Sequence, residues 1–253
     1  MSQKTDTSLP ARLRPSPNHN ERPEGCRIDT LILHYTGMTS AEAAIRRLCD
    51  PRAEVSAHYL VEEDGALHQL VPEARRAWHA GVSFWQGARD INDRSIGIEI
   101  VNPGHEFGYR AFPGAQIEVV ARLCLDICQR HGIPAERVLA HSDVAPARKE
   151  DPGELFPWDA LARAGVGQWL EPEPISGGRF FQEGDSGQPV EALQSMLALF
   201  GYEVEIDGVY DTQTRLAVTA FQRHFRPDRV DGVADMSTIT TLHRLLQNRP
   251  APG

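Results

Sequence analysis

The sequence has no long apolar run, few cysteines and no surplus of basic residues, and each absence excludes a class of protein. No segment approaches the roughly 20 consecutive apolar residues that a membrane-spanning helix requires. The 253 residues include four cysteines, none of them in a CxxC pair, so a disulfide framework is not expected. The formal net charge of −9 argues against a nucleic-acid partner, because phosphate binding requires clustered Lys and Arg.

The N-terminal segment, residues 1–24, is polar and rich in Pro, Ser and Asn. It lacks the apolar stretch and the small-residue cleavage site of a secretory signal. We therefore expect a flexible leader over residues 1–24. The missing signal favours the cytoplasm, although a non-standard export route would give the same sequence.

Strand and helix patterns alternate over the next part of the chain. Short apolar runs predict strands at residues 30–34, 58–61, 66–71, 95–101 and 138–141. Asp64-Gly65, between the second and third of these runs, is a strong hairpin signal. Helical spacing of apolar residues predicts helices over residues 41–48 and 115–130. This mixture predicts an α+β fold with a mixed β-sheet and flanking helices.

The character of the sequence changes near residue 169. Residues 169–179 are rich in Pro and Gly, which predicts a linker. Helices are expected beyond it, over residues 190–200, 212–225 and 237–246, and two Asp-Gly turns between them form a weak internal repeat. The expected organisation is therefore a leader (1–24), a larger domain (25–168), a linker (169–179) and a small three-helix bundle (180–248).

Three residues suit a metal ion. His34 and His141 each stand at the end of a predicted strand, and Asp151 follows in a loop. Two imidazoles and one carboxylate are a usual ligand set for zinc, and they leave a fourth position for water. The spacing alone also allows three unrelated polar residues, because the chain has ten histidines.

Glu99 and Lys149 are the next candidates. Glu99 lies on the strand face opposite three isoleucines, beside Gly97, where a carboxylate could accept a proton from an attacking water. A solvent-facing strand residue is the alternative for Glu99. The ammonium of Lys149, two residues before Asp151, could stabilise an oxyanion, or it could be an ordinary surface lysine.

Five motifs in a fixed order resemble a known family. They are HYT at residues 34–36, SAHYL at 56–60, AWHAG at 77–81, NDRSIGIE at 92–99, and AHSD at 140–143 with KEDPG at 149–153. In this order they resemble the N-acetylmuramoyl-L-alanine amidases of the type 2 amidase family, over about residues 25 to 165. The resemblance implies an α+β fold and hydrolysis of the amide between N-acetylmuramic acid and L-alanine of peptidoglycan or muropeptides.

The resemblance also implies roles for single residues. It implies a zinc ion (Zn2+) held by His34, His141 and Asp151, with Glu99 as general base and Lys149 as oxyanion stabiliser.

The family motifs further suggest substrate contacts. Trp78 and His79 lie in a loop that borders the cleft in the family, where an aromatic ring could stack on sugar or peptide. Asn92 and Arg94 could contact peptide carboxylates, or they could support the turn and the strand.

The C-terminal helices resemble the peptidoglycan-binding domain type 1, through GDSG at residues 184–187, DGVY at 207–210 and VDGV at 230–233. A binding domain favours polymeric peptidoglycan in the cell envelope, because it raises the local enzyme concentration on an insoluble substrate. The missing signal favours soluble muropeptides in the cytoplasm instead. Two other functions stay open, a non-catalytic peptidoglycan receptor and a zinc peptidase of the stem peptide. No protein partner is inferred.

Overall fold

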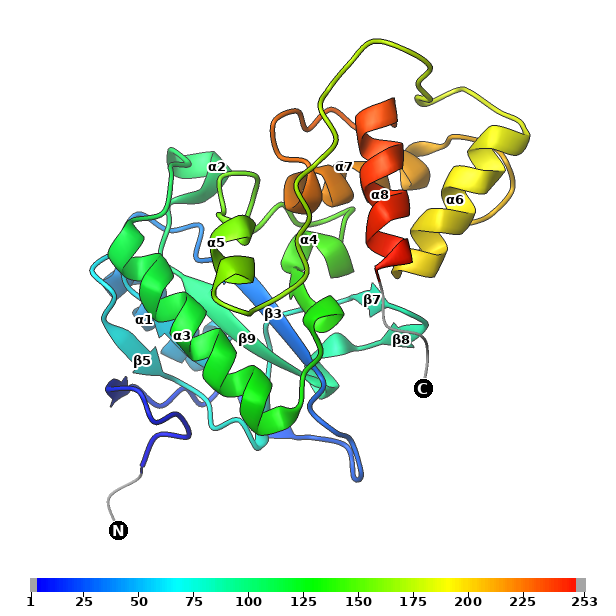
Figure 1. Ribbon diagram of the computed structural model, residues 1–253. Helices are drawn as coiled ribbons and strands as arrows, with labels where there is room; N and C mark the ends of the chain where they lie inside the picture. Colours follow the sequence, from blue (N-terminus) through cyan, green and yellow to red (C-terminus); the bar gives the residue numbers. More distant parts are fainter. Residues whose placement is uncertain (1–3, 249–253) are drawn as a thin grey trace.

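The computed structural model describes residues 4–248, and its larger domain is built on one six-stranded sheet (Figure 1). The strands in spatial order are β1 (Ala11–Leu13), β5 (Leu67–Gln69), β4 (Tyr59–Val61), β9 (Ser95–Ile100), β3 (Thr30–Tyr35) and β10 (Val138–Ala140). All neighbours are parallel except β4 and β5, which form the hairpin around Asp64-Gly65. The predicted α+β class and mixed sheet are confirmed.

Helices and short paired strands surround this sheet. They are α1 (Ala41–Cys49), α2 (Gly104–Phe107), α3 (Gly114–His131), α4 (His141–Val144), α5 (Trp158–Arg163), the strand pairs β2 (His19–Glu21) with β6 (Arg75–Ala77) and β7 (Phe84–Trp85) with β8 (Ala88–Arg89), and 3-10 turns at Pro51–Ala53, Ile91–Asp93 and Ala135–Arg137.

The two faces of the sheet have different roles. Because side chains alternate along a strand, Leu31 and Leu33 of β3 lie with the isoleucines of β9 in the cluster that packs under α3 and α5. His34 and Glu99 belong to the opposite face, and the register pairs them directly across β3 and β9. This second face carries the polar groups together with Ile32 and Leu60, which belong to two other apolar clusters.

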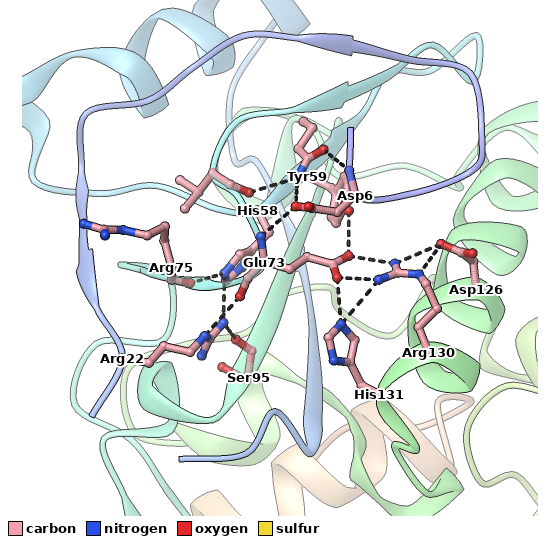
Figure 2. A network of polar contacts seen from close by, with 12 residues as sticks. Asp6, Arg22, His58, Tyr59, Glu73, Arg75, Ser95, Asp126, Arg130 and His131 are labelled. Atoms are coloured by element: carbon pink, nitrogen blue, oxygen red, sulfur yellow. Dashed lines mark hydrogen bonds and ion pairs between the residues drawn. The ribbon is translucent and has the colours of Figure 1, made fainter. Parts of the chain in front are cut away.

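Residues 4–24 are part of the domain, which contradicts the flexible leader expected there; residues 1–3 lie outside the described part. β1 extends the sheet beside β5, and β2 pairs with β6. Arg22 donates hydrogen bonds to the carbonyl oxygens of Glu73, Asn92, Asp93 and Ser95, at 2.7–3.1 Å. Figure 2 shows Arg22 within a polar network that extends to the carboxylate of Glu73 and the guanidinium of Arg130. Strands of three residues are too short to give a periodic signal, so the sequence pattern did not predict them.

The C-terminal helices are α6 (Gln188–Phe200), α7 (Thr212–Phe225) and α8 (Met236–Gln247), close to the predicted ranges. The internal repeat has a physical basis. Gln194 of α6 accepts the amide hydrogens of Asp207-Gly208, and Gln222 of α7 accepts those of Asp231-Gly232, so each turn is fastened by a buried glutamine of the preceding helix. Within residues 4–248 no helix is both long and apolar enough to cross a membrane.

Candidate active site

Three predicted metal ligands meet at the carboxyl ends of the parallel strands. His34 is in β3, His141 follows β10 directly, and Asp151 lies in the loop between α4 and α5. Nδ1 of His34 lies 2.9 Å from Nδ1 of His141, and Oδ2 of Asp151 lies 3.0 Å from each. All three side chains are buried. This group could hold a metal ion.

The hydrogen bonds of the outer nitrogens fix both ligand tautomers. Nε2 of His141 faces the carbonyl oxygen of Ala80 at 3.1 Å, so this nitrogen carries the hydrogen. The Ser95 hydroxyl donates to the carbonyl of Ile91 and accepts from Nε2 of His79.

Nδ1 of His79 therefore has no hydrogen, and it accepts from Nε2 of His34 at 3.0 Å. Burial and the neighbouring His141 lower the pKa of His34 to about 4, which keeps that ring neutral near pH 7. With both rings neutral, the Nδ1 lone pairs of His34 and His141 converge with a lone pair of Asp151 and no hydrogen lies between them. Such an arrangement suits a cation, and the donor set and tautomers suit zinc.

Gly97 leaves the space that His79 occupies. A Cβ on Gly97 would lie 2.5 Å from Cγ of His79, closer than any real contact. His79 is buried, and both of its ring nitrogens are committed to His34 and Ser95. These bonds make His79 a support for His34. His79 also lines the cavity beside the ligands, so its predicted contact with substrate stays a prediction.

Glu99 sits beside the ligand cluster and is 9% exposed, so it is not the solvent-facing residue that strand alternation allowed. Burial raises the pKa of its carboxyl well above the ordinary value; the charge of Asp151 adds to this rise and Lys149 opposes it. Oε2 of Glu99 has no hydrogen-bond partner among residues 4–248. A buried carboxylate with a free oxygen and a raised pKa is suited to proton transfer.

One cavity of about 260 Å³ joins these groups. Its wall contains the three ligands together with Glu99 and Lys149, so the structure brings all five predicted residues to one place. Such a cavity, with a few convergent polar groups, is the usual form of a catalytic cleft.

Comparisons with known proteins show which family the chain belongs to. A family model described as N-acetylmuramoyl-L-alanine amidase matches residues 24–154, just over half of the chain. The chain belongs to this amidase family. A second model, described as a putative peptidoglycan binding domain, matches residues 186–242, within the C-terminal helices.

Several relatives match the amidase over most of its length. The N-acetylmuramoyl-L-alanine amidase AmiD of Escherichia coli is 39% identical over 236 residues, which cover 87% of this chain and 83% of AmiD. A structure of the E. coli AmiD complex with anhydro-N-acetylmuramic acid-L-Ala-D-gamma-Glu-L-Lys aligns with a TM-score of 0.74 and 36% identity over 90% of this chain and 92% of that one. The crystal structure of AmpDh3 from Pseudomonas aeruginosa aligns with a TM-score of 0.75 and 30% identity, over 99% of this chain and 100% of that one. Both alignments extend across the helical domain.

Three of the predicted substrate contacts lie outside the cavity wall of the amidase. Nε1 of Trp78 donates to Oδ1 of Asn20 at 2.8 Å. Oδ1 of Asn92 accepts the amide hydrogens of His79 and Ala80. The guanidinium of Arg94 pairs with the carboxylate of Asp29. Each side chain therefore has a structural partner instead, and a direct role in substrate binding stays a prediction.

The cavity also contains residues that sequence reasoning missed. Met38, Ala44, Leu48 and Val55 form an apolar part of its wall, and Arg47 of α1 lines it as an exposed cation. No side-chain hydrogen bond or ion pair is found for Arg47 within residues 4–248. The signal was weak in the sequence, because nothing in residues 41–48 distinguishes Arg47 from the adjacent Arg46.

Proposed function

We propose that this protein is a zinc-dependent hydrolase of the amide bond between N-acetylmuramic acid and L-alanine, acting on peptidoglycan or muropeptides. One observation supports it above the others. Three lone pairs, from His34, His141 and Asp151, converge beside a buried carboxylate and an ammonium in a single cavity. A zinc ion bound there supplies a Lewis acid, which polarises a carbonyl and makes water acidic near neutral pH.

Glu99 is the proposed general base and then the general acid. Its free Oε2 takes a proton from the water that attacks the amide carbonyl, and the same oxygen later delivers that proton to the departing alanine nitrogen. The raised pKa supports the second step, because burial favours the protonated carboxyl that must deliver this proton. Water then adds across the amide, which yields a free carboxylate on the sugar and a free amine on the peptide.

Lys149 is the proposed stabiliser of the tetrahedral oxyanion. It is partly buried on the wall of the same cavity, and its charge counters the rise of the Glu99 pKa, so its field reaches the reacting groups. A cation fixed where negative charge develops is among the larger contributions to catalysis.

Arg47 is the proposed contact for a carboxylate of the stem peptide. The Arg47 guanidinium lies on the cavity wall and has no hydrogen-bond or ion-pair partner in the described part of the chain. Its geometry matches a planar anionic group, and the stem peptide offers carboxylates. The apolar residues beside it accommodate methyl groups of the lactyl and alanyl units.

Polymer and soluble fragment are both candidate substrates. The helical domain, similar to peptidoglycan-binding domains, supports the polymer. The relative solved with an anhydro-muropeptide supports the fragment.

The test is incubation of purified protein with intact sacculi and, in parallel, with anhydro-N-acetylmuramyl tripeptide, with and without a chelator, followed by mass spectrometry. We expect chelator-sensitive release of the whole stem peptide. Residues left attached to the sugar would indicate a peptidase. Zinc binding without release from either substrate would indicate a receptor.

A further inference from the structure

A buried carboxylate of the amidase domain is held by the helical domain. Asp143, two residues after His141, is 1% exposed, and its Oδ2 accepts the amide hydrogen of Ala140 at 2.8 Å. The hydroxyl of Tyr202 donates to Oδ1 of Asp143 at 2.7 Å, and Nδ1 of His224 donates to Oδ2 at 2.6 Å. Two of these three bonds therefore come from the other domain.

The surrounding interface is packed like a core. The ring of His224 stacks between Trp158 and Phe225, with centroid distances of 3.7 Å to each. Trp85 meets Tyr202 edge-on at 5.1 Å, and α4 lies beside α7 (Figure 1). Because close-packed groups transmit strain, a shift of one domain at this interface would displace the residues of the other domain that contact it.

A close backbone approach requires a glycine at this interface. A Cβ on Gly201 would lie 2.6 Å from Cε2 of Trp85, and the φ of Gly201 is +140°. The amide of Gln86 also donates to the carbonyl oxygen of Gly201 at 3.0 Å. The helical domain is therefore docked in one defined position on the amidase domain.

The C-terminal end of residues 141–151, the segment that joins His141 to Asp151, also contacts the helical domain. Arg223 of α7 donates to Glu150 at 2.9 Å, between Lys149 and Asp151. Glu150 is half exposed, so this pair alone contributes little. Its position nevertheless means that contacts from α7 reach both ends of residues 141–151.

We propose that the helical domain positions residues 141–151, and through them the metal ligand His141, in addition to any binding of cell-wall polymer. Asp143 is the connection, because a buried carboxylate holds one position only while its donors stay in place. Partners beyond the ligands orient a metal site in this way. The inference rests on the proposed function in one respect, the assignment of His141 as a metal ligand.

The test removes the bonds to Asp143 and keeps the packing. Tyr202→Phe deletes one donor, and His224→Phe keeps the aromatic stack but deletes the other. Tyr210→Phe is the control, because that buried tyrosine donates to the carbonyl of Gly232 within the helical domain. Zinc affinity is measured in the full-length chain by competition with a chromophoric chelator. The kcat and KM are measured on anhydro-N-acetylmuramyl tripeptide, and binding is measured on isolated cell walls.

We expect the double variant Tyr202→Phe/His224→Phe to lose about 10–100-fold in zinc affinity or kcat, the range for groups that support metal ligands. KM and cell-wall binding should stay unchanged, and Tyr210→Phe should match wild type in zinc affinity and kcat. Wild-type zinc affinity and kcat in the double variant would overturn the inference. If the double variant does not fold, Tyr202→Phe alone decides. If wild type releases no peptide, the proposed reaction fails, and the zinc affinities still decide this inference.

Discussion

A methyl group on Gly97 should weaken the metal site without touching a ligand. The Cβ of Gly97→Ala would lie 2.5 Å from Cγ and 2.6 Å from Nδ1 of His79. Carbon atoms in contact are normally about 3.5–4.0 Å apart, so the His79 ring must move by about 1 Å. The bond of 3.0 Å from His34 to Nδ1 of His79 would then lengthen beyond hydrogen-bond range.

The expected loss has two parts. Overpacking of a buried site costs about 1–3 kcal/mol of folding stability. Loss of the partner that orients His34 should raise the zinc dissociation constant about 10–100-fold. Gly114→Ala is the matched control, because Gly114 is exposed and, among residues 4–248, no atom beyond its chain neighbours and the adjacent helix backbone lies within 4 Å of the position that a Cβ would take there.

The measurements are chelator competition for zinc and urea unfolding of the metal-free protein. The double variant Gly97→Ala/His79→Ala removes the clash, so it should be more stable than Gly97→Ala and should bind zinc as His79→Ala does. Unchanged zinc affinity in both Gly97→Ala and His79→Ala would refute the view that His79 holds His34.

Three further predictions concern different parts of the chain. Glu99→Gln should lower kcat by about 10²–10⁴-fold and leave zinc affinity near wild type, as measured by peptide release and metal titration; turnover within tenfold of wild type would exclude Glu99 as the base. Arg47→Ala should raise KM for muropeptides about tenfold, which corresponds to the loss of one charge-assisted hydrogen bond. The control Arg46→Ala removes only an exposed ion pair with a glutamate one turn away, so KM should stay unchanged. Arg22→Ala should lower the free energy of unfolding by about 3 kcal/mol in urea titrations, because four carbonyl groups lose the hydrogen bonds that Arg22 donates. The control Arg12→Ala, at an exposed position, should change it by less than about 0.5 kcal/mol.

The metal cluster was predicted from the order of the family motifs, because spacing alone left three unrelated polar residues as an alternative. Strand periodicity located β3, β9 and β10, and parallel pairing brings their carboxyl ends together. His34, Glu99 and His141 converge for that reason. The same alternation left open whether Glu99 faced solvent, since a strand pattern shows which residues share a face but not what covers it.

Other features depend on contacts that sequence patterns do not carry. Pairing of β1 and β2 uses backbone groups, and each strand has only three residues, so it forms without a periodic signal in the sequence. Docking of the helical domain depends on single matches between distant residues, such as Gly201 against Trp85 and Tyr202 with Asp143. Arg47 was missed because only the folded cavity distinguishes it from Arg46.

Asn92 shows how a residue in the family motifs can support the site through the backbone. Its Oδ1 accepts the amide hydrogens of His79 at 3.1 Å and of Ala80 at 2.8 Å. The ring of His79 bonds to His34, and the carbonyl of Ala80 accepts from His141. One buried amide therefore fixes the two residues that orient both ligand histidines. A geometric role of this kind requires an acceptor with two lone pairs at this position, which explains why an asparagine there serves the site as a support.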